Sequence, residues 1–147
     1  MARTDGLAGR HCIYVDANIF IYFVEGAGAE RETATALFLE AADRGIRLVT
    51  GEISIAECLR GVIGQDEATA ASIYRDLFSN GSIVEMVAAD PILYEYAALA
   101  GSLFSLKLVD AIHLASAVMA DCDAFLTNDK GIRGPETLQI IRLSDLI

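Results

Sequence analysis

The chain of 147 residues carries a formal net charge of −10 at pH 7, and 54% of its residues are hydrophobic against 22% charged. This composition predicts one packed domain over residues 1–147 and excludes a disordered chain. The acidic balance argues against a protein that holds nucleic acid on a broad basic surface, but not against an enzyme that meets phosphate through bound cations.

The first half of the chain predicts two strands separated by helices. Residues 1–10 are polar and include two glycines, so we expect a loose lead-in. An apolar run that ends in Asp16 is typical of a buried parallel strand delivering a carboxylate to the edge of a sheet. In chain order the pattern predicts a strand at 12–16, helices at 18–25 and 30–44, a strand at 46–50, and helices at 53–62 and 66–78, the last with Ile73, Leu77 and Phe78 facing the core.

The second half continues the same alternation. Asp90 followed by Pro91 is a favourable helix start, with a capping carboxylate and a proline at the first helical position. The predicted elements are a strand at 83–87, helices at 91–106 and 109–121, and strands at 124–127 and 138–143. Strands that alternate with helices indicate an α/β fold with a parallel, helix-covered sheet.

The cysteines and the hydropathy pattern indicate the cellular compartment in which the protein is expected. Cys12, Cys58 and Cys122 are odd in number, form no C-x-x-C pair and lie in or beside apolar runs, which favours buried reduced thiols over a disulfide framework. No run of about 18 uninterrupted apolar residues predicts a membrane span, and the N-terminus lacks the apolar core of a signal peptide. We therefore expect a cytoplasmic protein with no membrane partner.

Four acids occupy positions that this fold would bring to one place. Asp16 ends the first strand, Glu57 lies in the helix after the second, Asp110 opens the helix before the fourth, and Asp129 follows the fourth. Carboxylates packed together repel each other, and a divalent cation relieves that repulsion. Oxygen-only ligands favour Mg²⁺ or Mn²⁺ over zinc, and such a cation suits phosphodiester hydrolysis.

Each acid also has an ordinary structural interpretation, which the spacing alone leaves open. Asp16 and Asp110 could serve only as helix N-caps, Glu57 as a solvated helix residue and Asp129 as a turn residue. His113 lies three residues after Asp110 and could ligate a metal, but its apolar neighbours favour a packed, hydrogen-bonded histidine.

Other polar residues near these positions are interpreted as structural or solvated. Asp123, a loop acid before a strand, is expected to be solvated. Ordinary surface charge is the favoured role for four basic residues that could instead contact RNA phosphate, namely Arg60, Lys107, Lys130 and Arg133.

Four local motifs occur in order along the chain. They are Val-Asp-Ala-Asn-Ile-Phe-Ile-Tyr at 15–22, Ile-Ala-Glu-Cys-Leu at 55–59, Leu-Val-Asp-Ala-Ile-His-Leu-Ala-Ser-Ala at 108–117 and Phe-Leu-Thr-Asn-Asp-Lys-Gly-Ile at 125–132. Together they resemble the PIN-domain family, and most of all the VapC-type ribonuclease toxins of prokaryotic toxin–antitoxin modules. The resemblance covers nearly the whole chain from about residue 12.

The resemblance implies a three-layer α/β/α sandwich around the parallel sheet, and a metal-dependent endoribonuclease. Asp16, Glu57, Asp110 and Asp129 match the family's acidic quartet, which would bind one or two Mg²⁺ or Mn²⁺ ions and position a water to cut RNA. Thr127 and Asn128 match the polar positions beside the last acid, and Asn18 matches a position that holds the first. The resemblance also implies a homodimer and a small antitoxin partner that covers the acidic pocket.

Three alternatives remain open at the level of sequence. A PIN nuclease with a housekeeping task in RNA processing or DNA cleavage would carry the same motifs. A catalytically idle PIN module that only binds a partner would not need the complete quartet. A metal-dependent phosphatase of another α/β fold would usually have a second Asp two residues after the first, where this chain has Asn18.

Overall fold

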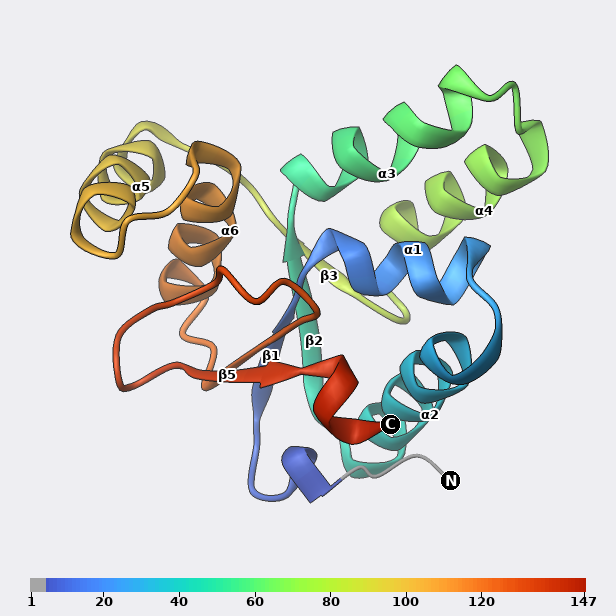
Figure 1. Ribbon diagram of the computed structural model, residues 1–147, viewed down its shortest axis with the longest axis horizontal. Helices are drawn as coiled ribbons and strands as arrows, with labels where there is room; N and C mark the ends of the chain where they lie inside the picture. The colour runs from blue at the N-terminus through green and yellow to red at the C-terminus, as the bar shows by residue number, and fades with distance from the viewer. Residues whose placement is uncertain (1–4) are drawn as a thin grey trace.

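The computed structural model describes residues 5–147. A parallel sheet of five strands forms its centre, and the strand order is β3-β2-β1-β4-β5 (Figure 1). The elements in chain order are η1 (Asp5–Leu7), β1 (Cys12–Val15), α1 (Ala17–Glu25), α2 (Gly28–Arg44), β2 (Arg47–Gly51), α3 (Ile53–Gly64), α4 (Ala68–Ser79), β3 (Glu85–Val87), α5 (Pro91–Leu103), α6 (Leu108–Met119), β4 (Ala124–Thr127), β5 (Gln139–Arg142) and η2 (Leu143–Leu146).

Helices cover both faces of the sheet, with α5 and α6 on one side and α1 to α4 on the other (Figure 1). The alternation of side chains along β1 explains the two cores. Ile13 and Val15 pack into the core beneath α1 to α4, whereas Cys12 and Tyr14 pack into the core beneath α5 and α6. The predicted α/β/α architecture around a parallel sheet is therefore confirmed.

The helix boundaries follow from local signals in the sequence. The Asp90 carboxylate accepts a hydrogen bond from the Leu93 backbone N–H at 2.8 Å, and Pro91 occupies the first turn of α5, as predicted. Gly45 ends α2 at a φ of 68°, a left-handed conformation that glycine adopts without strain. Among the described residues no single helix could cross a membrane by length and hydropathy; α5 and α6 meet the test only as a pair bent by 119°.

Three predictions about individual residues are wrong. Leu7 is only 2% exposed and packs into the main core, so the part of the lead-in within the described residues is not loose, while residues 1–4 lie outside them. Ile73 is 45% exposed, because the buried stripe of α4 is centred on Tyr74 and points about 100° away from it. Asp123 is half-buried, and its Oδ2 accepts hydrogen bonds from the backbone N–H groups of His11 and Cys12 at the start of β1.

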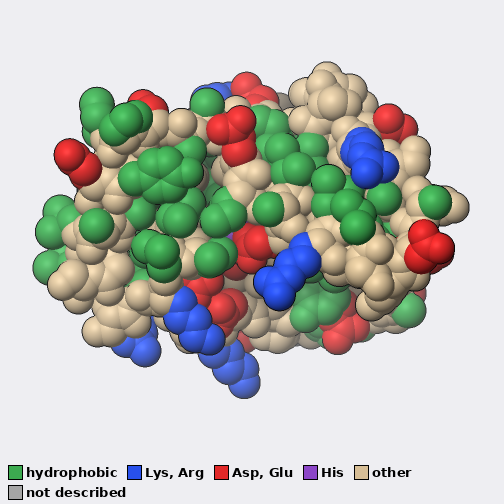
Figure 2. All heavy atoms as spheres, turned by 90° about the horizontal axis from the view of Figure 1, so that it is seen from above, with side chains coloured by type: hydrophobic (Ala, Val, Ile, Leu, Met, Phe, Trp, Pro, Cys, Tyr) green, Lys and Arg blue, Asp and Glu red, His purple; other side chains and the backbone are tan. Residues whose placement is uncertain are grey.

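The carboxyl edge of the sheet gathers the segments of interest. The neighbouring strands β2, β1 and β4 run parallel and all end there, so the first residues of α1, α3 and the loop after β4 lie at the same edge. Figure 2 looks onto this edge and shows acidic side chains near the middle of the face, with basic side chains beside them. Ligand sites in open α/β sheets form at such an edge.

Candidate active site

Asp16 is the most enclosed acid at this edge, with an exposed fraction of 4%. Its Oδ1 accepts the Ala17 backbone N–H at 2.8 Å, so Asp16 is the N-cap of α1. Its Oδ2 accepts the Thr127 hydroxyl at 2.7 Å and the Asn18 side-chain amide at 3.2 Å. Burial raises the pKa of Asp16, and the hydrogen bond from Thr127 opposes that shift only in part.

A polar network joins α1 to the loop after β4 around this carboxylate. The Asn18 amide oxygen accepts the Asn128 backbone N–H at 3.1 Å, and the Thr127 hydroxyl accepts the Asp129 backbone N–H at 3.0 Å. The Asn128 amide donates to the Tyr22 hydroxyl at 3.1 Å, and its oxygen accepts the Ser144 N–H at 3.0 Å. Asn18, which the resemblance matched to a position that holds the first acid, thus contacts Asp16. Thr127, matched to a position beside the last acid, contacts Asp16 as well as the Asp129 backbone, and Asn128 fixes the loop that carries Asp129.

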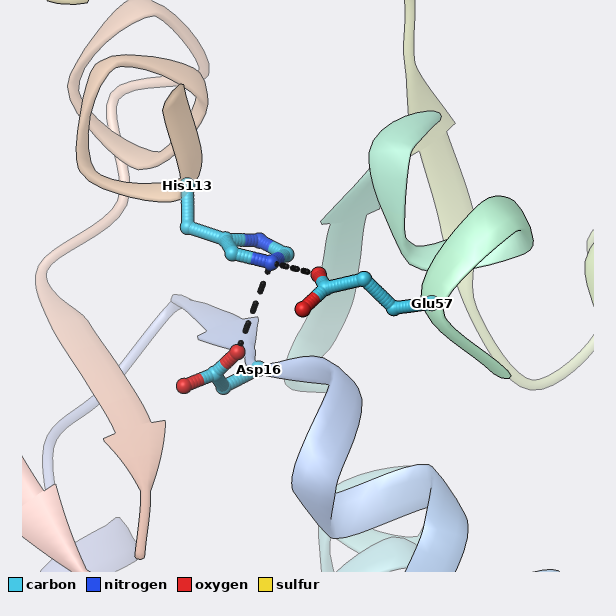
Figure 3. A group of neighbouring side chains, drawn as sticks. All are labelled: Asp16, Glu57 and His113. Carbon is cyan, nitrogen blue, oxygen red and sulfur yellow. Dashed lines mark hydrogen bonds and ion pairs between the residues drawn. The ribbon is translucent and has the colours of Figure 1, made fainter. Parts of the chain in front are cut away.

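Glu57 reaches the same edge from α3 and meets Asp16 through His113 of α6 (Figure 3). The His113 Nε2 hydrogen-bonds Glu57 Oε1 and lies 3.5 Å from Asp16 Oδ1. His113 is fully buried, as the sequence predicted, but it lies between two acids rather than among apolar side chains only. Two sequence signals pointed to this position, namely its apolar neighbours, which indicate burial, and its spacing of three residues from Asp110.

Asp110 and Asp129 complete the acidic edge at a greater distance. Both are half-buried. Burial raises the pKa of Asp110, and the negative charges of Asp129, Asp16 and Glu57 raise it further, which places all four carboxyls within electrostatic range. Asp129 Oδ1 also accepts the Gly131 N–H at 2.8 Å, so the residue has the turn contact that its loop position suggests.

These groups fit a divalent cation. The ligand atoms of Asp16, Glu57 and His113 lie within 4.8 Å of one another, whereas Asp110 and Asp129 lie outside that tight group. In the described part of the chain the ion pairs of these acids are with His113, and no Lys or Arg lies within 4 Å of them. Burial lowers the pKa of His113, but the Glu57 hydrogen bond and the Asp16 charge outweigh it and raise the pKa overall. Such excess negative charge on partly buried carboxyls is what a hard cation compensates.

The sequence model of the PIN domain family matches residues 13–136, which include all four acids and the residues that hydrogen-bond the Asp16 carboxylate. The chain belongs to the PIN domain family. No curated protein matches this PIN domain in sequence.

Solved structures share the PIN fold at low sequence identity. VapBC2 of Rickettsia felis, solved with a DNA fragment from its promoter, matches with a TM-score of 0.71 and 14% identity, covering 89% of this chain and 98% of that one. Mycobacterium tuberculosis VapC20, described as a Sarcin-Ricin loop cleaving toxin, matches with a TM-score of 0.62 and 17% identity, covering 77% of this chain and 86% of that one. A toxin–antitoxin complex from Klebsiella pneumoniae matches with a TM-score of 0.63 and 20% identity, covering 86% of this chain and 94% of that one.

Proposed function

We propose that this PIN domain is a Mg²⁺- or Mn²⁺-dependent endoribonuclease that acts as the toxin of a toxin–antitoxin pair. The observation that carries the proposal is the gathering of four carboxyls at the carboxyl edge of the sheet, in a chain of a nuclease family. The fold shared with VapC20, a Sarcin-Ricin loop cleaving toxin, supports RNA as the substrate class.

Asp16, Glu57, Asp110 and Asp129 would hold the cation, and they are our candidate catalytic residues. When bound, the cation would lower the pKa of a water and offset the charge that develops on the phosphate. Asp16 Oδ2 already accepts two hydrogen bonds, whereas Oδ1 accepts only the Ala17 N–H at short distance. We therefore expect Oδ1 to be the Asp16 oxygen that faces the ion.

Asn18, Thr127 and Asn128 would position the acids rather than react. Asn18 and Thr127 donate to Asp16 Oδ2 and limit the rotation of its carboxylate. Thr127 also accepts the Asp129 backbone N–H, so one hydroxyl links two acids from opposite ends of the chain. Asn128 ties the loop that carries Asp129 to α1 through Asn18 and Tyr22.

The partner we propose is a small cognate antitoxin, and the proposed assembly is a cytoplasmic homodimer. Support for the antitoxin comes from the Rickettsia felis VapBC2 and Klebsiella pneumoniae structures, whose folds this chain shares and which are complexes of this kind. A partner that covers the edge shown in Figure 2 would block access to the four acids.

Cleavage of RNA by purified protein tests the proposal. The Asp16→Asn and Asp110→Asn variants remove one negative charge each with little change in volume, and Asp43→Asn, on the exposed end of α2, is the matched control. We expect Mg²⁺-dependent cleavage by the native protein and the control, and a loss of at least about 100-fold in both site variants. Wild-type cleavage by either site variant would remove that residue from the active site.

Expression in growing cells separates the toxin from the two PIN alternatives. A toxin stops growth on induction, with new RNA 5′ ends that are absent when the Asp16→Asn variant is induced. Cleavage without growth arrest would indicate a housekeeping nuclease. If calorimetry detects no binding of Mg²⁺ or Mn²⁺ and no RNA is cut, the protein is an idle partner-binding module.

A further inference from the structure

A buried line of hydrogen bonds runs from β2 to Glu57. The Gly51 backbone N–H donates to the Tyr14 hydroxyl oxygen at 2.9 Å, and that hydroxyl lies 2.6 Å from His113 Nδ1. The opposite ring nitrogen, Nε2, bonds to Glu57 Oε1. Tyr14 and His113 are both fully buried, so solvent does not compete for these bonds.

The partners of Tyr14 fix the direction of this line. Among the described residues, Gly51 and His113 meet both the distance and the angle of a hydrogen bond to its hydroxyl. The hydroxyls of Thr50 and Ser116 also lie near it, but they donate to the backbone carbonyls of Val15 and Ile112. Gly51 N–H is a donor only, so the hydroxyl proton is left for His113 Nδ1. A neutral imidazole that accepts at Nδ1 carries its proton on Nε2, where it faces Glu57 and Asp16.

We propose that Tyr14 holds His113 in the form protonated on Nε2, and that this N–H group positions Glu57 beside Asp16. Nε2 also carries a proton in the doubly protonated ring, so the donor persists whatever the charge of the imidazole. A protonated Nε2 has no lone pair for a cation. His113 is therefore a positioning residue, although its ring lies within ligand distance of both acids.

Glu57 needs such support more than Asp16 does. Its side chain is 36% exposed, whereas that of Asp16 is 6% exposed and is already fixed by Thr127 and Asn18. A long glutamate side chain left free at a helix surface samples many rotamers, and binding a cation would have to suppress them. This role rests on the proposed function, because the placement of Glu57 matters for activity only if its carboxylate holds the ion.

Nitrogen-15 NMR of histidine-labelled protein tests the tautomer without any assay of function. The chain has two histidines, and the His11→Gln variant, changed at an exposed position, assigns the signals. In the presence of Mg²⁺, at a pH where the ring is neutral, we expect His113 to show a protonated Nε2 and an unprotonated Nδ1. Tyr14→Phe should shift the signals toward a mixture of both forms. A protonated Nδ1 with a bare or metal-bound Nε2 in the native protein would overturn the proposal.

Calorimetric titration with Mn²⁺ tests the positioning itself. Gln places an amide N–H near the position of Nε2, whereas Leu fills space without a donor. We expect His113→Leu to bind Mn²⁺ about 10- to 100-fold more weakly, the usual cost of losing a partner of a metal ligand, and His113→Gln to stay close to the native protein. Tyr14→Phe, which keeps the ring and the packing, should lie between them and serves if His113→Leu does not fold.

Two results would contradict the positioning role. One is an equal loss of Mn²⁺ affinity in His113→Gln and His113→Leu, which would indicate that the ring only fills space. The other is native Mn²⁺ affinity in His113→Leu. If the native protein binds no Mn²⁺ at all, the proposed function fails, and the proposed positioning of Glu57 as a metal ligand fails with it. The NMR experiment decides separately whether Tyr14 donates to His113.

Discussion

The hydroxyl of Thr127 lies 2.7 Å from Oδ2 of Asp16, although 111 positions separate the two residues in the chain. Thr127 is fully buried at the end of β4, and Asp16 is 4% exposed at the end of the neighbouring β1. The strand pairing thus supplies a donor to a carboxylate that burial makes costly to ionise.

Two substitutions of Thr127 should distinguish the contribution of its hydroxyl to stability from that of its volume. Thr127→Val keeps the shape but leaves Asp16 without one donor and the Asp129 N–H without an acceptor, so we expect the free energy of unfolding to fall by about 1–3 kcal/mol. Thr127→Ser keeps the hydroxyl, so its free energy of unfolding should fall much less. Urea unfolding of the metal-free proteins measures both. Equal stabilities for the Val variant and the native protein would mean that this bond does not stabilise the fold.

Metal-free protein should become less stable as the pH rises. Folding raises the pKa of Asp16, Asp110 and His113, so the folded state holds more protons than the unfolded one. As the pH rises above 3.8, the ordinary pKa of an aspartate carboxyl, the stability of the folded state therefore falls until the pH has passed the raised pKa values of Asp16 and Asp110. The stability that His113 contributes is complete below its ordinary pKa of 6.5 and is lost as the pH rises through its raised pKa. Thermal melts across this range measure the slope.

Added Mg²⁺ should flatten that dependence, because a bound cation favours the ionised carboxylates. The Asp16→Asn variant without Mg²⁺ is the control, since it lacks one of the three titrating groups and should show a smaller slope. Metal-free stability that rises with pH between about 5 and 8 would contradict the assigned directions of the pKa shifts.

Two lysines for which the sequence favours ordinary surface charge are expected to contact RNA, because both are exposed and lie close in the chain to acids of the candidate site. Lys107 precedes α6 three residues before Asp110, and Lys130 directly follows Asp129. With the inactive Asp110→Asn protein as background, Lys107→Ala and Lys130→Ala should each weaken RNA binding and reduce the salt slope by about 0.7. Arg44→Ala, at the end of α2 and before the amino end of β2, is the control. Salt slopes that are the same in all three variants would assign the lysines to ordinary surface charge.

The Cys58 thiol should resist alkylation in the folded protein. Burial raises its pKa to about 12, so only about one thiol in 10,000 is ionised at pH 8. Mass spectrometry after iodoacetamide treatment should find Cys58 unmodified in native buffer and modified in guanidinium chloride. A Ser72→Cys variant, exposed on α4, gives the positive control. Rapid native modification of Cys58 would show that this part of the core opens readily.

The sequence predicted the parts of the structure that depend on local pattern. The apolar run before Asp16 predicted the central strand and its acid, Gly45 predicted the end of α2, and Asp90 with Pro91 predicted the start of α5. The face of α4 was misjudged, because hydrophobicity alone does not say that Tyr74 rather than Ile73 points inward.

Contacts between distant segments were the part that local pattern did not contain. The apolar neighbours of His113 correctly predicted that it is buried. Its hydrogen bonds to Tyr14 and Glu57, however, depend on how α6 packs against β1 and α3. Asp123 was misread for the same reason, since its partners are backbone N–H groups more than 100 residues earlier in the chain. The grouping of the four acids followed only from the fold and from the resemblance.

The pairing of β1 with β4, in which Ile13 lies opposite Ala124, sets the order in which the protein is completed during translation. A ribosome releases β1 early, yet Asp16 stays without Thr127 and Asp129 until β4 and the loop that follows it have left the exit tunnel, late in synthesis. Nascent chains that lack β4 therefore do not carry the complete acidic edge, and the proposed nuclease would gain its site only near the end of synthesis.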